Sequence, residues 1–192
     1  TDEFIEKLKV DIPELPDEKK KRFIDKFKVS PYEATILVSD IETAKYFEEV
    51  VAKMGKNQDM KLAVNWITGE LFAVLNNKNL EISESPISAK NLAKLINLIK
   101  NGTISGKIAK TIFELMMDGD KDPQIIVEEK GLKQESDPKA LEALIDKIIN
   151  DNREKAIEYK NGKEKLFGFF VGQAMKVSGG KANPKLINEI LK

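Results

Sequence analysis

The feature that most constrains the fold is a repeated signal for the start of a helix. At four predicted helix starts a short polar residue stands directly before proline: Ser30-Pro31, Asp122-Pro123, Asp137-Pro138 and Asn183-Pro184. Such a side chain accepts a hydrogen bond from the free amides of the first helical turn. Proline fits the first helical position because it has no amide to satisfy. Glu33 lies three residues after Ser30 and completes a capping box. The pattern predicts helices along most of the chain.

Other cap and breaker signals divide the rest of the chain in the same way. Asp40, Ser88 and Ser105 are predicted N-caps, and Gly131 and Asn161-Gly162 are predicted helix ends. Residues 57–76 carry apolar side chains at helical spacing, which predicts one long helix. The alternation typical of strands is nearly absent. We therefore expect an all-α fold.

The polar segment at residues 128–138 is the best candidate linker, because it contains a helix-ending glycine and stops at Asp137-Pro138. It predicts a helical bundle domain at residues 1–130 and a small three-helix domain at residues 131–192. Helices of the smaller domain are expected at about residues 138–151, 163–177 and 184–191, with a short helix near 153–160.

Missing residue types narrow the function. The chain contains neither histidine nor cysteine, which removes the commonest general base, the commonest metal ligand and all thiol chemistry. No apolar run approaches the ~18 residues of a membrane span, so a soluble protein is predicted. Asp118, Asp120 and Asp122 begin like a calcium loop, but the closing glutamate is misplaced. We predict no catalytic residues, no metal site and no cofactor in this chain.

Charge is unevenly distributed, although the 32 basic side chains equal the 32 acidic ones. Residues 153–192 carry nine basic and four acidic side chains. A nucleic-acid site is therefore expected to be a local patch near the C-terminal end.

The helix predicted at residues 163–176 has two unlike faces at ~100° per residue. One face is an apolar stripe of Phe167, Phe170, Val171 and Ala174. The opposite face combines two lysines, two glycines and an aromatic ring: Lys165, Gly168, Phe169, Gly172 and Lys176. Each glycine inside a helix costs ~1 kcal/mol relative to alanine, so something must offset roughly 2 kcal/mol.

Two interpretations of this face stay open at this point. In one, a nucleic acid approaches the bare backbone, the lysines neutralise phosphates, and Phe169 stacks on a base. In the other, the glycines let a neighbouring helix pack closely, and Phe169 fills that seam.

The segment that follows favours the first interpretation. Ser178-Gly179-Gly180-Lys181 leads into a helix that is capped by Asn183. Two adjacent glycines can turn their amides inward as an anion nest, and Lys181 and Lys185 add full positive charges. A flexible loop with ordinary lysines is the alternative. Because the segment adjoins a helix face of the same charge, RNA binding is our prediction.

Residues 101–110 form a second small-residue turn that opens a helix, with Lys107 and Lys110 in its first turns. This is not a nucleotide P-loop, because the glycine spacing is one residue short and Ile108 replaces the hydroxyl that binds magnesium. A plain helix cap is the other interpretation. The run Lys19–Arg22 lies among acidic residues and is predicted to be a solvated helix face.

Four stretches carry a resemblance to a known family. They are AVNWITGELFAVLN (63–76), GTISGKIAK (102–110), KDPQIIVEEKGLKQESD (121–137) and GKEKLFGFFVGQAMKVSGGKANPKLINEIL (162–191). They run in the family's order. Over essentially its whole length, the chain resembles the C-terminal tail of the B subunit of aspartyl/glutamyl-tRNA(Asn/Gln) amidotransferase.

This resemblance implies a fragment of a longer protein, in which a helical tail domain precedes a YqeY-like domain that recognises the body of a transfer RNA by shape and phosphate charge. It implies a heterotrimer with an amidase (A) subunit and a small (C) subunit, in a bacterial-type cytoplasm or an organelle. The parent complex is a carbon–nitrogen ligase with glutamine as amide donor. It makes Gln-tRNA(Gln) or Asn-tRNA(Asn) from misacylated precursors. Its ATP and magnesium bind in a domain that has no counterpart in this chain.

Carried over by position, the resemblance assigns transfer-RNA binding to these residues: Lys107, Lys110, Lys163, Lys165, Phe169, Gly172, Lys176, Ser178, Gly179, Gly180, Lys181, Asn183 and Lys185. The alternative function is a helical protein-interaction module that docks on the enzyme core or on the partner subunits. An exposed apolar patch on the first domain is its expected mark.

Overall fold

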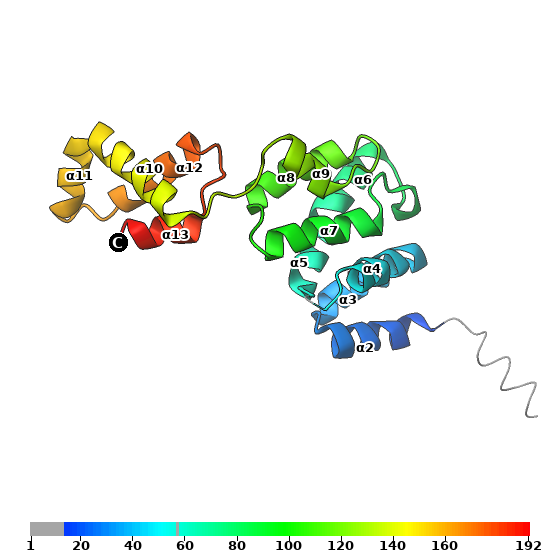
Figure 1. Ribbon diagram of the computed structural model, residues 1–192. Coiled ribbons are helices and arrows are strands. Elements are labelled where there is room, and N and C mark those ends of the chain that lie inside the picture. The colour runs from blue at the N-terminus through cyan, green and yellow to red at the C-terminus, as the bar shows by residue number, and fades with distance from the viewer. Residues whose placement is uncertain (1–13, 57) are drawn as a thin grey trace, which may run out of the picture. The chain divides into compact units, whose positions relative to one another are not determined.

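The computed structural model describes residues 14–56 and 58–192 (Figure 1). Helices run through that part of the chain, which contains no strand, and one isolated parallel bridge pairs Glu135 with Ala182. The predicted all-α fold class is confirmed.

The chain forms two compact units, Thr1–Ile96 and Asn97–Lys192. The division falls inside helix α7 (Ala89–Lys100). The boundary predicted between residues 130 and 131 is a different division of the chain, and it stays a prediction.

The first unit contains the helices α2 (Pro16–Phe27), α3 (Pro31–Leu37), α4 (Ile41–Lys53), α5 (Met60–Asn65) and α6 (Phe72–Lys78), the π-helix η1 (Trp66–Leu71), the 3₁₀ helix η2 (Ile82–Glu84) and the first part of α7. The predicted caps are in place. The Ser30 hydroxyl accepts a hydrogen bond from the amide of Glu33 at 3.2 Å, and the Glu33 carboxylate accepts one from the amide of Ser30 at 2.8 Å. The Asp40 carboxylate accepts from the amide of Thr43 at 2.9 Å.

Three phenylalanine rings form the core where α2 meets α4. Phe23, Phe27 and Phe47 are buried, and their ring centroids lie 5.2–5.4 Å apart in edge-on and tilted arrangements. Such pairs are the geometry that aromatic quadrupoles favour.

The long helix predicted at residues 57–76 is only partly correct. Asp59 accepts a hydrogen bond from the amide of Leu62 at 2.9 Å, so the helix begins at Met60, and Asn57 lies outside the described residues. Its middle widens into the π-helix η1, and it continues to Lys78. Apolar spacing over a few turns does not separate α from π geometry, so the sequence pattern did not reveal the wider turn.

The second unit contains α8 (Gly106–Met116), α9 (Pro123–Glu129), α10 (Pro138–Asp151), α11 (Arg153–Lys160), α12 (Leu166–Val177) and α13 (Pro184–Ile190). The predicted caps Ser105, Asp122, Asp137 and Asn183 each accept a hydrogen bond from an amide of the first turn. The helices predicted for the C-terminal region are confirmed to within a few residues.

Helices α10, α12 and α13 pack around one apolar cluster, and Figure 1 shows them side by side. Its buried members are Leu141, Ile145, Ile148, Phe170, Ala174, Ala182 and Ile187. Phe170 and Ala174 are the two buried residues of α12, so the cluster fixes which face of that helix points outward.

Candidate nucleic-acid interface

The outward face of α12 is the one that the sequence singled out. Lys165, Gly168, Gly172 and Lys176 are all exposed, whereas Phe170 is 3% exposed. Lys165 and Lys176 are eleven residues apart, which puts them about 20° apart around the helix and about three turns apart along it. No acidic side chain in the described chain pairs with either lysine. We call Lys165, Gly168, Gly172 and Lys176 the glycine ridge.

The two ridge glycines have no packing partner. A methyl group added at Gly168 or Gly172 would meet no atom within 4 Å, and neither glycine has a positive φ. Neither close packing nor backbone strain within the described residues therefore requires glycine there. The interpretation that these glycines admit a neighbouring helix of the same chain is wrong for that part of the chain. Contacts within the described residues therefore do not offset the ~2 kcal/mol that the two glycines cost.

Phe169 is half-buried beside the ridge, and its ring is already in contact. It meets Phe170 edge-on with the ring centroids 5.4 Å apart, and the Lys155 ammonium lies 3.8 Å from its ring centroid. Stacking of Phe169 on a base stays a prediction, but a base would have to displace Lys155 from the ring.

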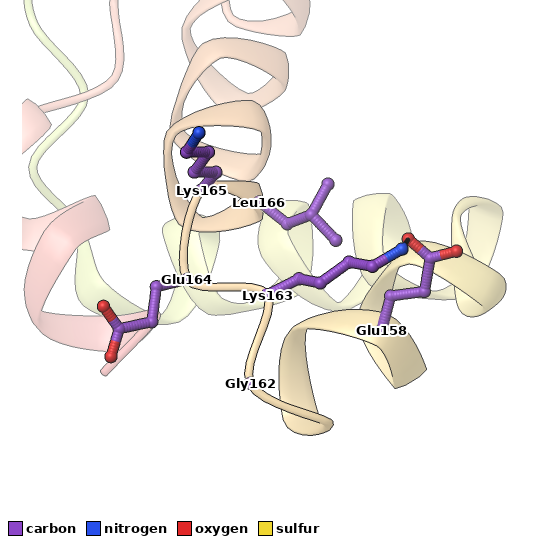
Figure 2. Close-up of a pocket in the computed structure, with 6 residues that line it drawn as sticks. All are labelled: Glu158, Gly162, Lys163, Glu164, Lys165 and Leu166. Carbon is purple, nitrogen blue, oxygen red and sulfur yellow. Dashed lines mark hydrogen bonds and ion pairs between the residues drawn. The ribbon is translucent and has the colours of Figure 1, made fainter.

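The turn between α11 and α12 holds two predicted lysines in different environments. A cavity of about 580 Å³ is lined here by Glu158, Gly162, Lys163, Glu164, Lys165 and Leu166. Figure 2 shows Lys163 reaching across to Glu158, and its ammonium lies 3.1 Å from that carboxylate. Lys165 points away from this pair (Figure 2). The charge of Lys163 is thus partly neutralised, whereas that of Lys165 is available to a ligand.

The predicted anion nest at the glycine pair is wrong. Gly179 and Gly180 both have positive φ, at 62° and 82°, so they end α12 rather than alternate in the way that points successive amides at one ligand. Their amides donate to the carbonyls of Lys176 and Met175 at 3.1 and 2.8 Å. The amide of Lys181 donates to the Ser178 carbonyl at 3.1 Å. These amides donate to the carbonyls at the end of α12, because the last carbonyls of a helix have no partner within the helix. The amides are therefore not available to an anion.

The two turns that the sequence singled out separately lie against each other. The Ser105 hydroxyl donates to the Gly180 carbonyl at 3.2 Å. The side chain of Lys107 passes Gly180, where an added methyl group would lie 3.4 Å from the lysine Cδ. Gly180 is buried in this contact. The GTISGK and SGGK motifs therefore belong to one surface.

The predicted linker segment takes part in the same junction. The amide of Gln134 donates to the Thr103 carbonyl at 2.7 Å. Glu135 donates its amide to the Lys181 carbonyl at 2.7 Å, and its own carbonyl accepts from the Asn183 amide at 3.0 Å. Residues 134–136 are thus tied to both turns. Sequence reasoning missed this contact, because a two-bond bridge between distant segments leaves no periodic signal.

The lysines around this junction differ in exposure. Lys107, Lys110, Lys176 and Lys185 are exposed, and Lys181 is half-buried. Ser178 and Asn183 have structural partners: the Ser178 hydroxyl accepts from the Ala182 amide at 3.1 Å, and the side-chain amide of Asn183 donates to the Ser136 hydroxyl at 3.3 Å. Around this junction, Lys107, Lys176 and Lys185 remain exposed to a polyanion, whereas Ser178, Gly180 and Asn183 hold the junction together.

The run Lys19–Arg22 is not the solvated face that was predicted. Arg22 pairs with Glu14 through Nε at 2.7 Å and with Glu48 through Nη1 at 2.6 Å, and Lys19 lies 3.7 Å from Glu48. The hydrogen bond from Arg22 lowers the pKa of Glu14 below its usual value. Charges from α4 and from the segment before α2 therefore neutralise half of the run. The prediction considered only the acidic residues that adjoin the run along the chain, so it did not include Glu14 and Glu48.

Two further kinds of feature are absent from the described residues. No helix among them is long and apolar enough to span a membrane. No group of three or more His, Cys, Asp or Glu side chains within the same residues is placed to hold a metal ion.

Comparison with known proteins gives a consistent set of relatives. A family model described as a GatB domain matches residues 45–192. Proteins named as the B subunit of aspartyl/glutamyl-tRNA(Asn/Gln) amidotransferase are 94% identical in Pelagibacter ubique, 49% in Ehrlichia chaffeensis and 50% in Rickettsia africae. Each of these matches covers 100% of this chain. The chain spans 39% of the length of these relatives.

Proposed function

The chain belongs to the GatB domain family, and from that membership we propose that it is the transfer-RNA-binding tail of the B subunit of a tRNA-dependent amidotransferase. The observation that carries this proposal is the glycine ridge, whose two lysines lack acidic partners in the described chain and whose two glycines have open space above them. A partner outside the chain explains why glycine is used where alanine would be more stable.

The chemistry of the ridge suits folded RNA. Lysine ammonium groups neutralise phosphates, and the affinity that this provides does not depend on sequence. A smooth backbone between them lets a bulky polyanion approach more closely than a helix with ordinary side chains would. Recognition of a folded RNA by its shape needs no base-by-base code.

In this proposal the chain binds and does not catalyse. The amidation of misacylated transfer RNA, with glutamine as amide donor and with ATP and magnesium, belongs to the rest of the B subunit and to the A and C subunits. The tail would hold the RNA body while its charged end reaches that active site. A tail that contacts backbone and shape would hold transfer RNA of the Asn type and of the Gln type alike.

The test reverses the charge of the ridge. The double variant Lys165→Glu and Lys176→Glu is expected to abolish filter binding of labelled transfer RNA, while the melting temperature stays within about 2 °C, since both side chains are exposed. The matched control is Lys21→Glu with Lys53→Glu, the same change of net charge at exposed positions of the first unit. Unchanged affinity in the ridge variant would overturn the assignment. Equal loss in both variants would show a general charge effect.

A protein-interaction role is the second candidate, favoured by exposed apolar side chains on the first unit. Tyr32 and Ile41 are 75% and 65% exposed, and Leu15 is 58% exposed. Large exposed apolar side chains of this kind are typical of docking surfaces when they are contiguous. Size-exclusion chromatography with the A and C subunits, with and without transfer RNA, separates the two roles. Co-elution with the subunits that is lost in Tyr32→Ser with Ile41→Ser supports docking.

A further inference from the structure

Lys155 was not among the residues singled out by the sequence, yet it lies at the edge of the glycine ridge. It is the third residue of α11, a helix with no buried residues. Its ammonium sits 3.8 Å from the ring centroid of Phe169, which is next to Lys176 on the helical wheel of α12. No carboxylate of the described chain pairs with Lys155. Its charge is therefore held against the ridge by an aromatic ring alone.

The neighbouring charges on α11 behave differently. Glu158 is occupied by Lys163 at 3.1 Å, and Arg153 donates weakly to Asn150 at 3.4 Å. Lys155 is the α11 cation that contacts an α12 side chain of the proposed site. A cation over the face of a ring at the protein surface is weakly attracted to it, which favours one position of the ammonium without neutralising its charge.

Two kinds of RNA group, an unpaired base and a phosphate, are candidates for contact with Phe169 and Lys155. An unpaired base would gain affinity by stacking on Phe169, but it must first displace the ammonium. A phosphate needs no displacement, because the ring already holds the ammonium at the surface. Paired bases in an RNA helix have no free face to offer the ring, so a folded, largely base-paired RNA favours the second arrangement.

We propose that Lys155 is a phosphate-binding residue positioned by Phe169, so that this face selects the sugar–phosphate backbone of base-paired RNA rather than an unpaired base. The inference rests on the proposed function of the glycine ridge. Within it, Phe169 acts through Lys155 and does not contact the RNA bases.

The variant Lys155→Met tests the inference because the two chemistries predict opposite results. Loss of one phosphate contact should weaken transfer-RNA binding about three- to tenfold and lower the slope of log affinity against log salt by about 0.7–0.9. If instead a base stacks on Phe169, removal of the ammonium leaves affinity unchanged or raises it. Either of those last results overturns the inference.

Phe169→Leu and the double variant Lys155→Met with Phe169→Leu complete a double-mutant cycle. Phe169→Leu should weaken binding as Lys155→Met does, and the double variant should be no weaker than either single one. Lys155→Arg, which keeps a cation on the ring, should restore binding. Additive losses would show that the ring contacts RNA by itself and would contradict the positioning role. Because Phe169 is half-buried, a melting curve of each variant checks that the substituted chain is still folded.

The controls separate this inference from the proposed function. Lys147→Met removes an exposed lysine of α10 and should leave binding unchanged. Duplex RNA and single-stranded polyuridylate of equal length are the comparison probes, and Lys155→Met should weaken binding of the duplex more than binding of the single strand. If the ridge variant Lys165→Glu with Lys176→Glu loses binding while Lys155→Met does not, the inference fails and the function stands. If the ridge variant binds normally, the function itself fails.

Discussion

At the scale of single residues, glycine has two different uses in this chain. Gly180 is buried at φ 82° against the Lys107 side chain, so both its backbone and its surroundings favour glycine. Gly172 has an ordinary helical φ and open space above it. The first glycine serves the fold. The second destabilises its helix and gains nothing from the described chain, which is the pattern of a residue retained for a ligand.

Gly172→Ala is therefore expected to separate stability from binding. The variant should be more stable by about 1 kcal/mol, which for a chain of this size raises the melting temperature by about 2–4 °C. The added methyl group stands on the ridge, so transfer-RNA affinity should fall. Calorimetry and filter binding on the same samples measure both effects.

The matched control for that experiment is Gly69→Ala. Gly69 is also exposed and helical, and an added methyl group there would meet nothing within 4 Å, but it lies in η1 of the first unit. Gly69→Ala should raise the melting temperature and leave the affinity for transfer RNA unchanged. If Gly172→Ala binds RNA as well as the unmodified chain does, close approach of a ligand to the ridge is refuted.

At the scale of helices, the beginnings were predictable from sequence, and the contacts between distant segments were not. A cap such as Ser30 or Asp40 acts on amides three residues away, so the signal is contained in the sequence window that is read. The contact of Ser105 with Gly180 joins residues 75 positions apart through one hydroxyl and one carbonyl. Nothing in either segment specifies that pairing.

The candidate site shows the same limit. The glycine ridge was predictable because the faces of one helix follow from its period. The anion nest failed because the carbonyls at the end of α12 compete for the same amides. Lys155 was missed because its place over Phe169 depends on how α11 packs on α12, and the sequence of α11 alone shows only an exposed basic residue.

The cap of α3 leads to a prediction about pH. The ammonium of Lys61 lies 2.6 Å from the Glu33 carboxylate, and this hydrogen bond, with that from the Ser30 amide, lowers the pKa of Glu33 from 4.5 to about 2. Because the pKa is lower in the folded state, the ionised carboxylate stabilises the fold fully above pH 4.5. That contribution is lost as the pH falls towards 2.

Glu33→Gln should therefore melt below the unmodified chain at pH 7, and the difference between the two melting temperatures should shrink between about pH 4.5 and 2. Thermal melts monitored by circular dichroism across that range provide the comparison. Glu49→Gln, which removes an exposed carboxylate, is the matched control for the loss of one negative charge. A Glu33→Gln difference that stays constant with pH would contradict the role of the ion pair.

At the scale of the whole molecule, each of the two units of the described chain contains an apolar cluster. The phenylalanine cluster of α2 and α4 lies in the first unit, and the cluster around Phe170 and Ile145 lies in the second. A module as small as α10–α13 has little stability to spare, since a single core of that size supplies only ~3–5 kcal/mol. The proposed binding function depends on this module being folded, so binding is expected to be lost when the module unfolds.

Ile145→Ala tests whether the module α10–α13 unfolds separately from the rest of the chain. Ile145 is 3% exposed in the C-terminal cluster, and its truncation should cost about 2–5 kcal/mol, most of the stability of that module. Hydrogen exchange should then show loss of amide protection in α10–α13 while α2–α4 stay protected, and transfer-RNA binding should be lost. Val50→Ala, at a fully buried position of α4, should give the reverse pattern of protection and preserve the ridge. If Ile145→Ala instead lowers protection in both regions to the same extent, the chain unfolds as one cooperative unit, and a separately folding C-terminal module is excluded.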